Sequence, residues 1–388
     1  MSTPSDDRHQ GSLAPPASLG VIGGGQLGRM FIQAAQRMGY RAGVLGAIEQ
    51  GPGAQVAHWS VIGPPDNLPA LRSMLDHADA VTVEFENVSA PALRWLERRI
   101  PVRPGWRTVW VSQNRLREKT FLGDHGIPVA PWRPVRTPAE LDEAVQSLGV
   151  PFILKTADSG YDGKGQVRVD RADDAASAWS QLGRVTCVAE GWVDFACEVS
   201  VIVCRGADGD ARSFPVALNR HHRHILDATV MPAPVGPIVS QEARDLALAI
   251  ARHLGTVGVL TVEFFLTAAG RLLVNEIAPR PHNSGHLTME AAASSQFEQQ
   301  ARALAGLPPG STDLIAPAAM ANLLGDLWSD GPPDWSRMAR QDPGVKLHLY
   351  GKKTAAPGRK MGHLTVLDAD PDAALDRVLA ARRALVGR

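Results

Sequence analysis

Two glutamates, Glu263 and Glu276, are the residues whose types and spacing point most directly to chemistry. They lie in two runs of strand-forming residues, 259–266 and 271–277, and the segment between these runs ends in Ala269-Gly270. Because glycine accepts a positive φ, this segment predicts a hairpin turn. A two-residue loop would place the two glutamates directly opposite each other on one face. Carboxylates that close share a proton or bind a cation such as Mg²⁺, unless both are simply solvated.

The segment after Glu276 carries many hydrogen-bond donors on an irregular backbone. Two prolines and a glycine between positions 278 and 286 exclude a continued strand or an ordinary helix, so we expect a fixed loop. A guanidinium, an imidazole and an amide beside a dicarboxylate site are suited to holding an anionic substrate against a metal-bound phosphate. The donors of this loop are Arg280, His282, Asn283, Ser284 and His286.

A lysine and a glycine-rich loop form a second candidate site. Lys155 lies in the strand-like run PFILKT at 151–156, and the loop SGYDGKGQ at 159–166 precedes another strand at 167–169. This loop is not a Walker P-loop, because no helix and no GK[ST] follow it. A flexible glycine loop between two strands, with a lysine on the first strand, is an arrangement that closes over nucleotide phosphates. A glycine-rich hairpin without a ligand is the alternative.

A third glycine motif near the N-terminus has the form GxGxxG, at Gly23, Gly25 and Gly28, between a strand at 19–22 and a helical pattern. In this context the motif indicates dinucleotide binding, as in a dehydrogenase. However, the next strand, at 41–45, has no acidic residue directly after it that could bind a ribose. We therefore predict a tight turn at a helix N-terminus, which either holds a phosphate of a ligand or is purely structural.

Other polar residues lie at the ends of predicted strands and in turns. Glu84 and Glu86 follow a strand at 80–83, where they face either a ligand crevice or solvent. The histidines and arginines at 219–224 predict an anion-binding or solvated face and not a metal site. Cations also cluster in a turn near the C-terminus, which is either solvated or covers a substrate phosphate. These cations are Lys352, Lys353, Arg359 and Lys360.

The elements that must position these residues alternate between strands and helices up to about residue 112, which predicts a Rossmann-like α/β domain. A helix at 112–126 carries Arg115 and Lys119, which share one face because they are four residues apart. Gly126 follows as the residue that ends this helix. Such a helix face is usually solvated.

Two further strands, predicted at 186–188 and 199–203, are flanked by Glu190 and Glu198. An amphipathic helix at 240–255 then leads into the glutamate hairpin. These elements place acidic side chains near the hairpin, although exposed loop acids are the alternative for each. Alternating strands and helices followed by a strand-rich second half predict a mixed α/β and α+β chain.

Composition excludes several classes of function. Lys plus Arg and Asp plus Glu both number 40, so the net charge is zero and no long-range field attracts nucleic acid or anionic lipid. The three cysteines show no CxxC spacing, which is compatible with the reducing cytosol. No apolar run reaches the roughly 18 residues of a membrane helix, and residues 1–18 lack the apolar core of a signal peptide. We expect a soluble cytoplasmic protein that acts on small molecules.

The lysine strand, the glycine loop and the glutamate hairpin together resemble the ATP-grasp superfamily. Within it, the chain resembles the N5-carboxyaminoimidazole ribonucleotide synthases, which use ATP and bicarbonate in purine biosynthesis. The segments that carry this resemblance span most of the chain, and the last two are the most specific. They are GGGQLGRM, GYDGKGQ, NEIAPRPHNSGH and PGRKMGHL.

The resemblance implies a domain organisation and a homodimer. It also implies the reaction: carboxylation of 5-aminoimidazole ribonucleotide, through carboxyphosphate formed from ATP and bicarbonate, with Mg²⁺ as the metal. The expected parts are a disordered tail at 1–18, a Rossmann-like pre-ATP-grasp domain at 19–112, an ATP-grasp domain at 113–310 with a lid at about 130–195, and a β-rich C-terminal domain at 315–388.

The resemblance assigns roles to residues at the matching positions. Glu263 and Glu276 match metal positions, and Lys155, Arg280 and His282 match positions of catalytic importance. The nucleotide-binding positions are Arg115, Lys155, Gly160, Tyr161, Asp162, Gly163, Lys164, Gly165, Gln166, Glu190, Gly191, Trp192, Val193, Glu198, His221, Asn275 and Glu276. The ribonucleotide positions are Tyr161, Asp162, Lys164, Arg280, His282, Asn283, Ser284, Lys352, Lys353 and Arg359.

The chain departs from the resembled pattern at two positions. Lys164 stands where an arginine is common, which replaces a bidentate fork by a point charge. Ala278 stands where many ATP-grasp enzymes have an asparagine as a third metal ligand. Phosphate and water must therefore complete the metal shell.

Three alternatives remain open from the sequence. The nearest is a formate-dependent glycinamide ribonucleotide transformylase of the same superfamily, which has a related PRPH stretch but lacks the PGRKMGHL match. A nicotinamide-dependent oxidoreductase built on the GxGxxG turn is a second. The third is a non-catalytic nucleotide-binding regulator, against which the intact Lys155, Glu263 and Glu276 argue.

Overall fold

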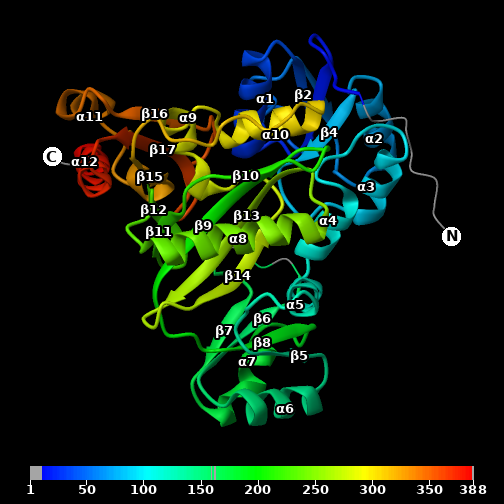
Figure 1. Cartoon of the computed structure of the whole chain (residues 1–388), viewed down its shortest axis with the longest axis vertical. Helices are drawn as coiled ribbons and strands as arrows, with labels where there is room; N and C mark the ends of the chain where they lie inside the picture. The colour runs from blue at the N-terminus through cyan, green and yellow to red at the C-terminus, as the bar shows by residue number, and fades with distance from the viewer. Residues whose placement is uncertain (1–10, 159, 161–162, 387–388) are drawn as a thin grey trace.

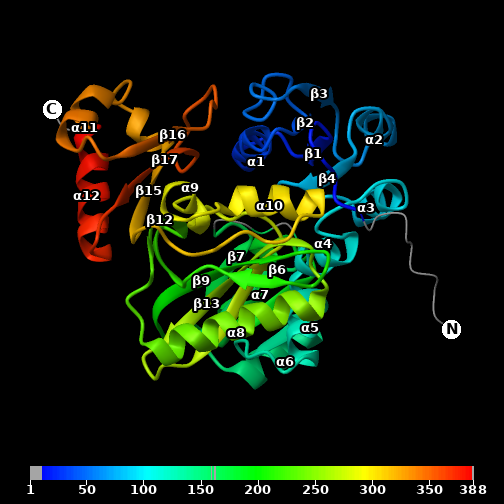
Figure 2. The ribbon, with the colours of Figure 1, turned by 45° about the horizontal axis from the view of Figure 1, so that its top comes forward.

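The structure, a computed structural model, describes residues 11–158, 160 and 163–386. In Figure 1, the N-terminal and C-terminal regions lie beside each other at one end of a central sheet, and a small sheet with its helices lies at the other end. Turning the molecule brings the first two regions forward and keeps them apart from the small sheet (Figure 2). Across the described ranges, no helix combines the length and apolar character needed to span a bilayer.

The N-terminal domain is a parallel sheet in the order β3-β2-β1-β4, with separate apolar cores on its two faces. Helices α1 and α10 cover one face, and α2 and α3 cover the other. Every residue of β1 is buried, as expected for a parallel strand covered on both sides. The predicted Rossmann-like architecture is confirmed. Its elements are β1 (Ser18–Ile22), α1 (Gln26–Arg37), β2 (Arg41–Gly46), β3 (Trp59–Ile62), α2 (Leu68–Leu75), β4 (Ala80–Val83), α3 (Ala90–Glu97) and α4 (Trp106–Ser112).

The small sheet is antiparallel, in the order β5-β8-β6-β7. Its apolar face packs against α6 and α7 through a core that includes Phe152, Leu154 and Trp179. Its other face is turned toward the central sheet, so Lys155 and Glu190 lie between the two sheets. Its elements are α5 (Arg115–Asp124), which precedes it, β5 (Trp132–Val135), α6 (Pro138–Leu148), β6 (Phe152–Thr156), β7 (Gln166–Val169), η2 (Ala172–Asp174), α7 (Ala175–Gln181) and β8 (Cys187–Gly191).

The central sheet follows the order β14-β13-β9-β11-β12-β15-β17-β16, with β10 paired to β9. One long helix, α8, packs its alanine-rich stripe on one face of the sheet against residues such as Val201, Val262 and Phe264. The first strands and helices of this region are β9 (Phe195–Arg205), β10 (Ala211–Ser213), β11 (Ala217–His222), β12 (Ile225–Met231), α8 (Pro237–Leu254), β13 (Gly258–Thr267), β14 (Leu272–Ala278), η3 (Asn283–Gly285), α9 (Thr288–Ala291) and α10 (Gln296–Ala305).

The C-terminal strands extend the same sheet. Strand β15 pairs with β12 over four residue pairs, from Ala228 with Ala321 to Met231 with Ala318. The predicted domain boundary near residue 310 therefore falls in a loop between two parts of one sheet, and it does not separate two sheets. The C-terminal elements are β15 (Ala318–Leu324), η4 (Gly325–Trp328), α11 (Trp335–Gln341), β16 (Lys346–Leu349), β17 (Lys360–Leu367) and α12 (Pro371–Ala384).

Two predicted elements are corrected. The helix expected at 112–126 begins at Arg115, because Asn114 accepts a hydrogen bond from the backbone N–H of Arg117 and so caps it. The strand expected at 186–188 runs on to Gly191, so Glu190 is a buried strand residue and not a loop acid. Both changes bring charged side chains onto rigid elements.

Candidate active site

The glutamate hairpin places Glu263 of β13 directly opposite Glu276 of β14, as predicted. The predicted two-residue loop is wrong: Thr267 pairs with Arg271 across a three-residue loop, in which Gly270 has φ 77°. The register is restored by a β-bulge, because Glu263 pairs with Glu276 while Phe264 pairs with Val274. Asn275 is thus the extra residue of the bulge.

The bulge determines which way Glu276 points. On β14, Leu272 and Val274 face the core under α8, so a regular strand would turn residue 276 to that face as well. With Asn275 inserted, Ile277 takes the core side and Glu276 shares the opposite face with Glu263. The candidate site therefore lies on the face of the sheet that α8 does not cover.

Glu263 is buried and contacts the loop that follows the hairpin. Its Oε1 lies 3.0 Å from Nε2 of His282, and both side chains are 13% exposed. Burial raises the pKa of Glu263 well above its usual range, and Glu276 adds to this shift, while His221 and Lys360 oppose it. Burial also holds the pKa of His282 well below its usual value, so this imidazole is neutral.

Arg115 links Glu276 to the glycine-rich loop. One nitrogen of its guanidinium lies 3.5 Å from Oε2 of Glu276, and another donates to the carbonyl of Gly160 at 3.4 Å. The backbone N–H of Arg115 also donates to Ala157. The N-terminus of α5 thus connects the start of the glycine loop to the glutamate hairpin.

The two residues in the middle of α5 hold the backbone on either side of Glu276. Oε2 of Glu118 accepts from the N–H of Ile277 at 3.1 Å, and Nζ of Lys119 donates to the carbonyl of Asn275 at 3.0 Å. Because β14 is an edge strand, these groups have no partner strand on that side. Sequence reasoning placed Lys119 on this helix but did not assign it to the site.

Glu190 receives a lysine at each carboxylate oxygen. Lys155 lies 2.8 Å from Oε2, and Lys119 lies 3.5 Å from Oε1. Burial alone would raise the pKa of Glu190, but the two lysines lower it to about 2. The site therefore contains an anionic carboxylate and two charged ammonium groups between the small sheet and the central sheet.

The remaining nucleotide-binding candidates lie on or directly beside strands of the small sheet and the central sheet. Nδ1 of His221 lies 3.0 Å from Oε1 of Glu198, which raises the pKa of His221 although burial opposes the shift. Trp192, 45% exposed, lies under the guanidinium of Arg168 at 4.1 Å. Of the other predicted members, Gly191 ends β8, Val193 follows it by two residues, and Gln166 begins β7.

The glycine-rich loop has the conformations that glycine allows. Gly163 and Gly165 have φ 77° and 72°, and a Cβ on Gly163 would approach the side chain of His224 to 2.6 Å. Lys164 lies between them and makes contacts of its own. The predicted ligand-binding residues Tyr161 and Asp162 lie outside the described residues.

The loop after the hairpin joins three parts of the chain. Arg280 donates to both oxygens of Glu86, at 2.6 and 3.2 Å, and so ties the loop to the N-terminal domain. Burial would raise the pKa of Glu86, but Arg280 holds it below its usual value. Both amide atoms of Asn283 are buried without a hydrogen bond to any described residue, as expected for a group that serves a ligand.

His286, in contrast, turns away from the glutamates. It contacts Gln296 through Nδ1 at 3.1 Å, and its ring packs against that of His363 at a tilt of 40°, with ring centroids 5.0 Å apart. His363 also accepts or donates to the hydroxyl of Tyr350 at 2.9 Å. The ends of two recognisable motifs, NSGH and MGHL, thus meet in one buried cluster. We call this cluster of His286, His363 and Tyr350 the buried seam.

The basic turn near the C-terminus lies against the N-terminal domain. Nζ of Lys353 donates to Gln50 at 2.8 Å, and Nζ of Lys352 donates to the carbonyl of Lys360 at 2.6 Å. Arg359 donates to the carbonyl of Thr354 within the turn. Lys360, which the sequence places in the basic cluster but to which the family resemblance gives no role, is close enough to affect the pKa of Glu263.

The N-terminal glycine turn is occupied by a side chain of the protein itself. Gly25 and Leu27 donate their backbone N–H groups to the two oxygens of Glu84. Glu84 is buried, and burial raises its pKa although these hydrogen bonds oppose the shift. The two hypotheses for this turn were phosphate binding and a purely structural role. The structure supports the structural role, because the carboxyl group of Glu84 already fills the turn.

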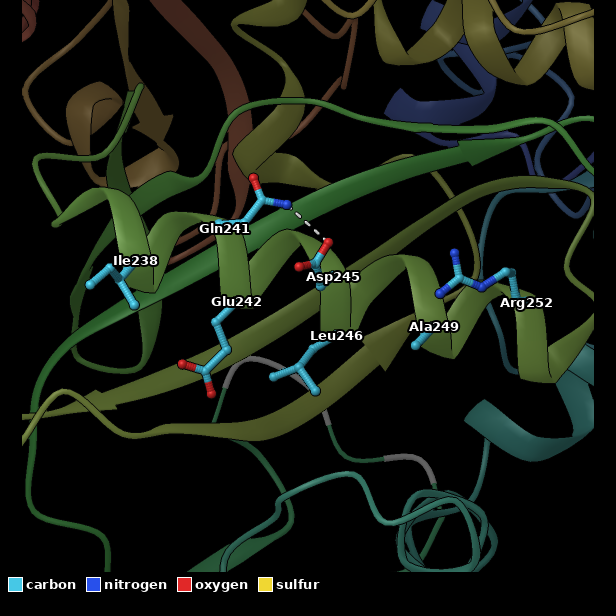
Figure 3. A pocket seen from close by; sticks show the side chains of 7 residues that line it. All are labelled: Ile238, Gln241, Glu242, Asp245, Leu246, Ala249 and Arg252. Carbon is cyan, nitrogen blue, oxygen red and sulfur yellow. Dashed lines mark hydrogen bonds between the residues drawn. The ribbon is translucent and has the colours of Figure 1, made fainter.

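A shallow hollow of about 650 Å³ lies elsewhere, along the outer face of α8 (Figure 3). Its lining includes a hydrogen bond between Gln241 and Asp245 at 3.0 Å. Glu263 and Glu276 are on the other face of the sheet. The hollow therefore takes no part in the candidate site.

The two carboxylates fit a hard divalent cation. Glu263 and Glu276 offer oxygen ligands on one face. Burial raises the pKa of Glu263, and the like-charge contact with Glu276, which a cation would relieve, raises it further. Within the described ranges, no three His, Cys, Asp or Glu side chains could hold a metal ion by themselves. A cation here therefore needs further oxygen ligands, such as phosphate.

Comparisons with known proteins agree with this geometry. Family models for an ATP-grasp domain, a ribonucleotide synthetase preATP-grasp domain and a phosphoribosylaminoimidazole carboxylase C-terminal domain match residues 120–297, 17–113 and 318–377. Fold and site define an ATP-grasp enzyme. N5-carboxyaminoimidazole ribonucleotide synthase of Bacillus subtilis is 42% identical over 364 residues, which cover 93% of this chain and 94% of that protein. The chain belongs to the N5-carboxyaminoimidazole ribonucleotide synthase family.

Solved structures show the same similarity. An ADP complex of N5-carboxyaminoimidazole ribonucleotide synthetase superimposes with a TM-score of 0.90 at 40% identity, over 95% of this chain and 97% of that one. The Aspergillus clavatus enzyme in complex with ADP and 5-aminoimidazole ribonucleotide gives 0.87 at 32% identity, over 95% and 98%. The predicted fold class and family are confirmed, whereas the roles of single residues stay predictions.

Proposed function

We propose that the chain catalyses the ATP-dependent carboxylation of 5-aminoimidazole ribonucleotide, with bicarbonate as the source of the carboxyl group, in purine biosynthesis. A single observation carries the proposal: the bulge at Asn275 turns Glu276 to the face of Glu263, beside a loop that presents Arg280, His282 and Asn283. The nucleotide site and the donor-rich substrate loop would thus lie side by side on the same face of the central sheet.

The nucleotide side of the site is built from cations and the glycine loop. Lys155 and Arg115 would neutralise phosphate charge, and the loop from Gly160 to Gln166 would cover the phosphates. Glu263 and Glu276 would hold Mg²⁺, which would neutralise further charge on the phosphates. Glu190 to Val193 and Glu198 with His221 would bind the nucleoside, in line with the family resemblance.

The reaction needs no covalent bond to the enzyme. An oxygen of bicarbonate attacks the γ-phosphorus of ATP, the bond to ADP breaks, and carboxyphosphate forms. The amine of the ribonucleotide then takes the carboxyl group, phosphate leaves, and the amine gives up a proton. The work of the chain is positioning and electrostatic stabilisation, for which Arg280, His282 and Asn283 are placed on the substrate side.

The basic turn would bind the phosphate of the ribonucleotide. Lys352, Lys353 and Arg359 come from the C-terminal region, and Lys353 contacts Gln50 of the N-terminal domain. We further propose the domain bounds 19–112, 113–310 and 315–388, a homodimer, and a cytoplasmic location. Light scattering on the purified protein tests the homodimer.

The function is tested by ADP release with ATP and Mg²⁺ at fixed bicarbonate, with and without 5-aminoimidazole ribonucleotide. Strong stimulation by the ribonucleotide, with formation of the carbamate, is the expected result. Stimulation by glycinamide ribonucleotide and formate instead would keep the fold and replace the substrate.

A further inference from the structure

A row of buried polar side chains crosses the central sheet and ends at His282. We call Thr229, Asn219, Ser200 and Ser284 the polar row. All four are buried, with exposed fractions of 0%, 5%, 0% and 0%. Thr229 pairs directly with Asn219, and Ser200 pairs directly with Glu263, so the row lies on the same face as the candidate site. Sequence reasoning gave a role only to Ser284 among these residues and named Asn219 only as the start of the cluster at 219–224.

Successive members of the polar row are hydrogen-bonded. The hydroxyl of Thr229 is 3.1 Å from Oδ1 of Asn219, and Nδ2 of Asn219 is 3.0 Å from Oγ of Ser200. Oγ of Ser200 is 2.9 Å from Oγ of Ser284, which is 2.9 Å from Nδ1 of His282. The row therefore forms an unbroken path from β12 to the imidazole.

Two groups, the amide of Asn219 and the backbone N–H of Ser284, indicate the same direction for the hydrogen bonds of the row. The N–H of Ser284 can only donate, and it lies 3.3 Å from Nδ1 of His282. Nδ1 is therefore an acceptor, so the hydroxyl of Ser284 must donate to it as well. The hydroxyl of Ser200 must then donate to Ser284. This order agrees with the amide of Asn219, which donates to Ser200 and accepts from Thr229.

An imidazole whose Nδ1 accepts carries its proton on Nε2 when it is neutral. Nε2 of His282 faces Oε1 of Glu263 at 3.0 Å. We infer that the polar row positions His282: it fixes one tautomer, whose Nε2 donates to Oε1 of Glu263 and leaves Oε2 for the cation. The inference deepens the proposed function, because it rests on the metal role given to Glu263.

The opposite tautomer of His282 would make Glu263 a poorer ligand for a cation. A bare Nε2 would face Oε1 of Glu263 with a lone pair, so that contact would require a proton on Glu263 itself. A protonated carboxyl is a poor ligand for a divalent cation. The polar row therefore keeps a hydrogen-bond donor, and not a lone pair, facing Oε1 of Glu263. Residues behind a ligand act in this way in many metal sites.

The tautomer is measured in the ligand-free protein by ¹⁵N NMR of histidine-labelled enzyme, with His282→Gln to assign the signal. We expect His282 to show the Nε2–H form in the wild-type protein. An Nδ1–H form would overturn the inference. This readout does not depend on any activity, so it stands even if the proposed reaction is not observed.

Asn219→Asp is the variant that should reverse the row. An aspartate at this position accepts from both Thr229 and Ser200, so Ser200 must accept from Ser284, and the hydroxyl of Ser284 can no longer donate to Nδ1. Only the 3.3 Å contact of the Ser284 backbone N–H then still holds Nδ1 as an acceptor. We expect the Nδ1–H tautomer to appear and Mg²⁺ affinity in the presence of ADP to fall about 10- to 100-fold. An unchanged tautomer in the folded variant would overturn the inference.

Thr261→Val is the matched control, because it also removes a buried hydroxyl from the face that carries Glu263. That hydroxyl makes no hydrogen bond within the described residues. Neither the tautomer nor the Mg²⁺ affinity should change. If Asn219→Asp does not fold, Ser284→Ala replaces it: only the 3.3 Å amide contact then holds Nδ1, so a fraction of Nδ1–H should appear. Its absence would equally overturn the inference.

Discussion

At the scale of single residues, the site is a set of charges that constrain one another. Glu190 stays anionic because Lys119 and Lys155 each face one of its oxygens. The charged form of Glu263, in contrast, is disfavoured both by burial and by the nearby Glu276. Ionising this carboxyl group is unfavourable in the metal-free protein and becomes favourable beside a cation. Binding of the metal is therefore coupled to release of a proton.

Replacing Glu276 by glutamine tests the dicarboxylate. The amide keeps the shape but loses the charge, so ATP turnover stimulated by the ribonucleotide should fall by at least about tenfold. Steady-state ADP release measures it. Glu242→Gln, on the outer face of α8, is the control and should keep wild-type turnover. Near-full turnover in Glu276→Gln would show that the metal assignment is wrong.

The pH dependence of metal binding tests Glu263. Its pKa is raised to about 8 in the metal-free protein, so below that pH the group carries a proton that a cation must displace. Mg²⁺ affinity should therefore increase as the pH rises from 6 toward 8 and then level off. Calorimetry in buffers of different ionisation enthalpy should detect the released proton. Binding without proton release, or the same release in Glu263→Gln, would contradict this assignment.

At the scale of elements, the hairpin shows what local sequence can specify. The two strands and the turn were predictable from two runs of strand-forming residues and from Gly270. The bulge was not, because it depends on Glu118 and Lys119 of α5 binding the outer edge of β14. The predicted pairing of the glutamates was correct, although the loop is longer than predicted, since the bulge compensates for it.

Gly270→Ala tests the turn. A Cβ at this position meets no atom within 4 Å, so the cost comes only from the positive φ, and the free energy of unfolding should drop by about 1 kcal/mol. Gly123→Ala is the matched control: its Cβ is equally uncrowded but lies in α5, so it should raise stability by about 0.5–1 kcal/mol. Chemical denaturation measures both. Equal effects of the same sign would contradict the argument.

At the scale of the whole molecule, the site depends on contacts between distant segments. Arg280 joins Glu86 of the N-terminal domain, and the buried seam joins His286 to His363. Sequence motifs predicted that these segments belong to one site, but no local pattern showed which pairs meet. The polar row was missed for the same reason, because Ser200, Asn219 and Thr229 become neighbours only across strands.

Shortening the chain tests the shared sheet. A protein that ends at residue 314 lacks β15, β16 and β17 and exposes the edge of β12. An uncovered edge strand pairs with other chains, so we expect this protein to aggregate rather than to fold with an intact nucleotide site. Solubility and binding of ADP measure the outcome. A soluble, ADP-binding fragment would show that the C-terminal strands fold separately.

The pairing of β12 with β15 also bears on how such a chain can change during evolution. A segment that occupies its own globule can be duplicated, lost or exchanged by recombination with little effect on its neighbours. Here the C-terminal strands complete a sheet begun elsewhere, and their turn carries cations proposed to meet the substrate. A replacement would have to match both the strand register at Ala318 to Ala321 and the spacing of that turn. The region is therefore expected to be inherited with the rest of the chain as one unit.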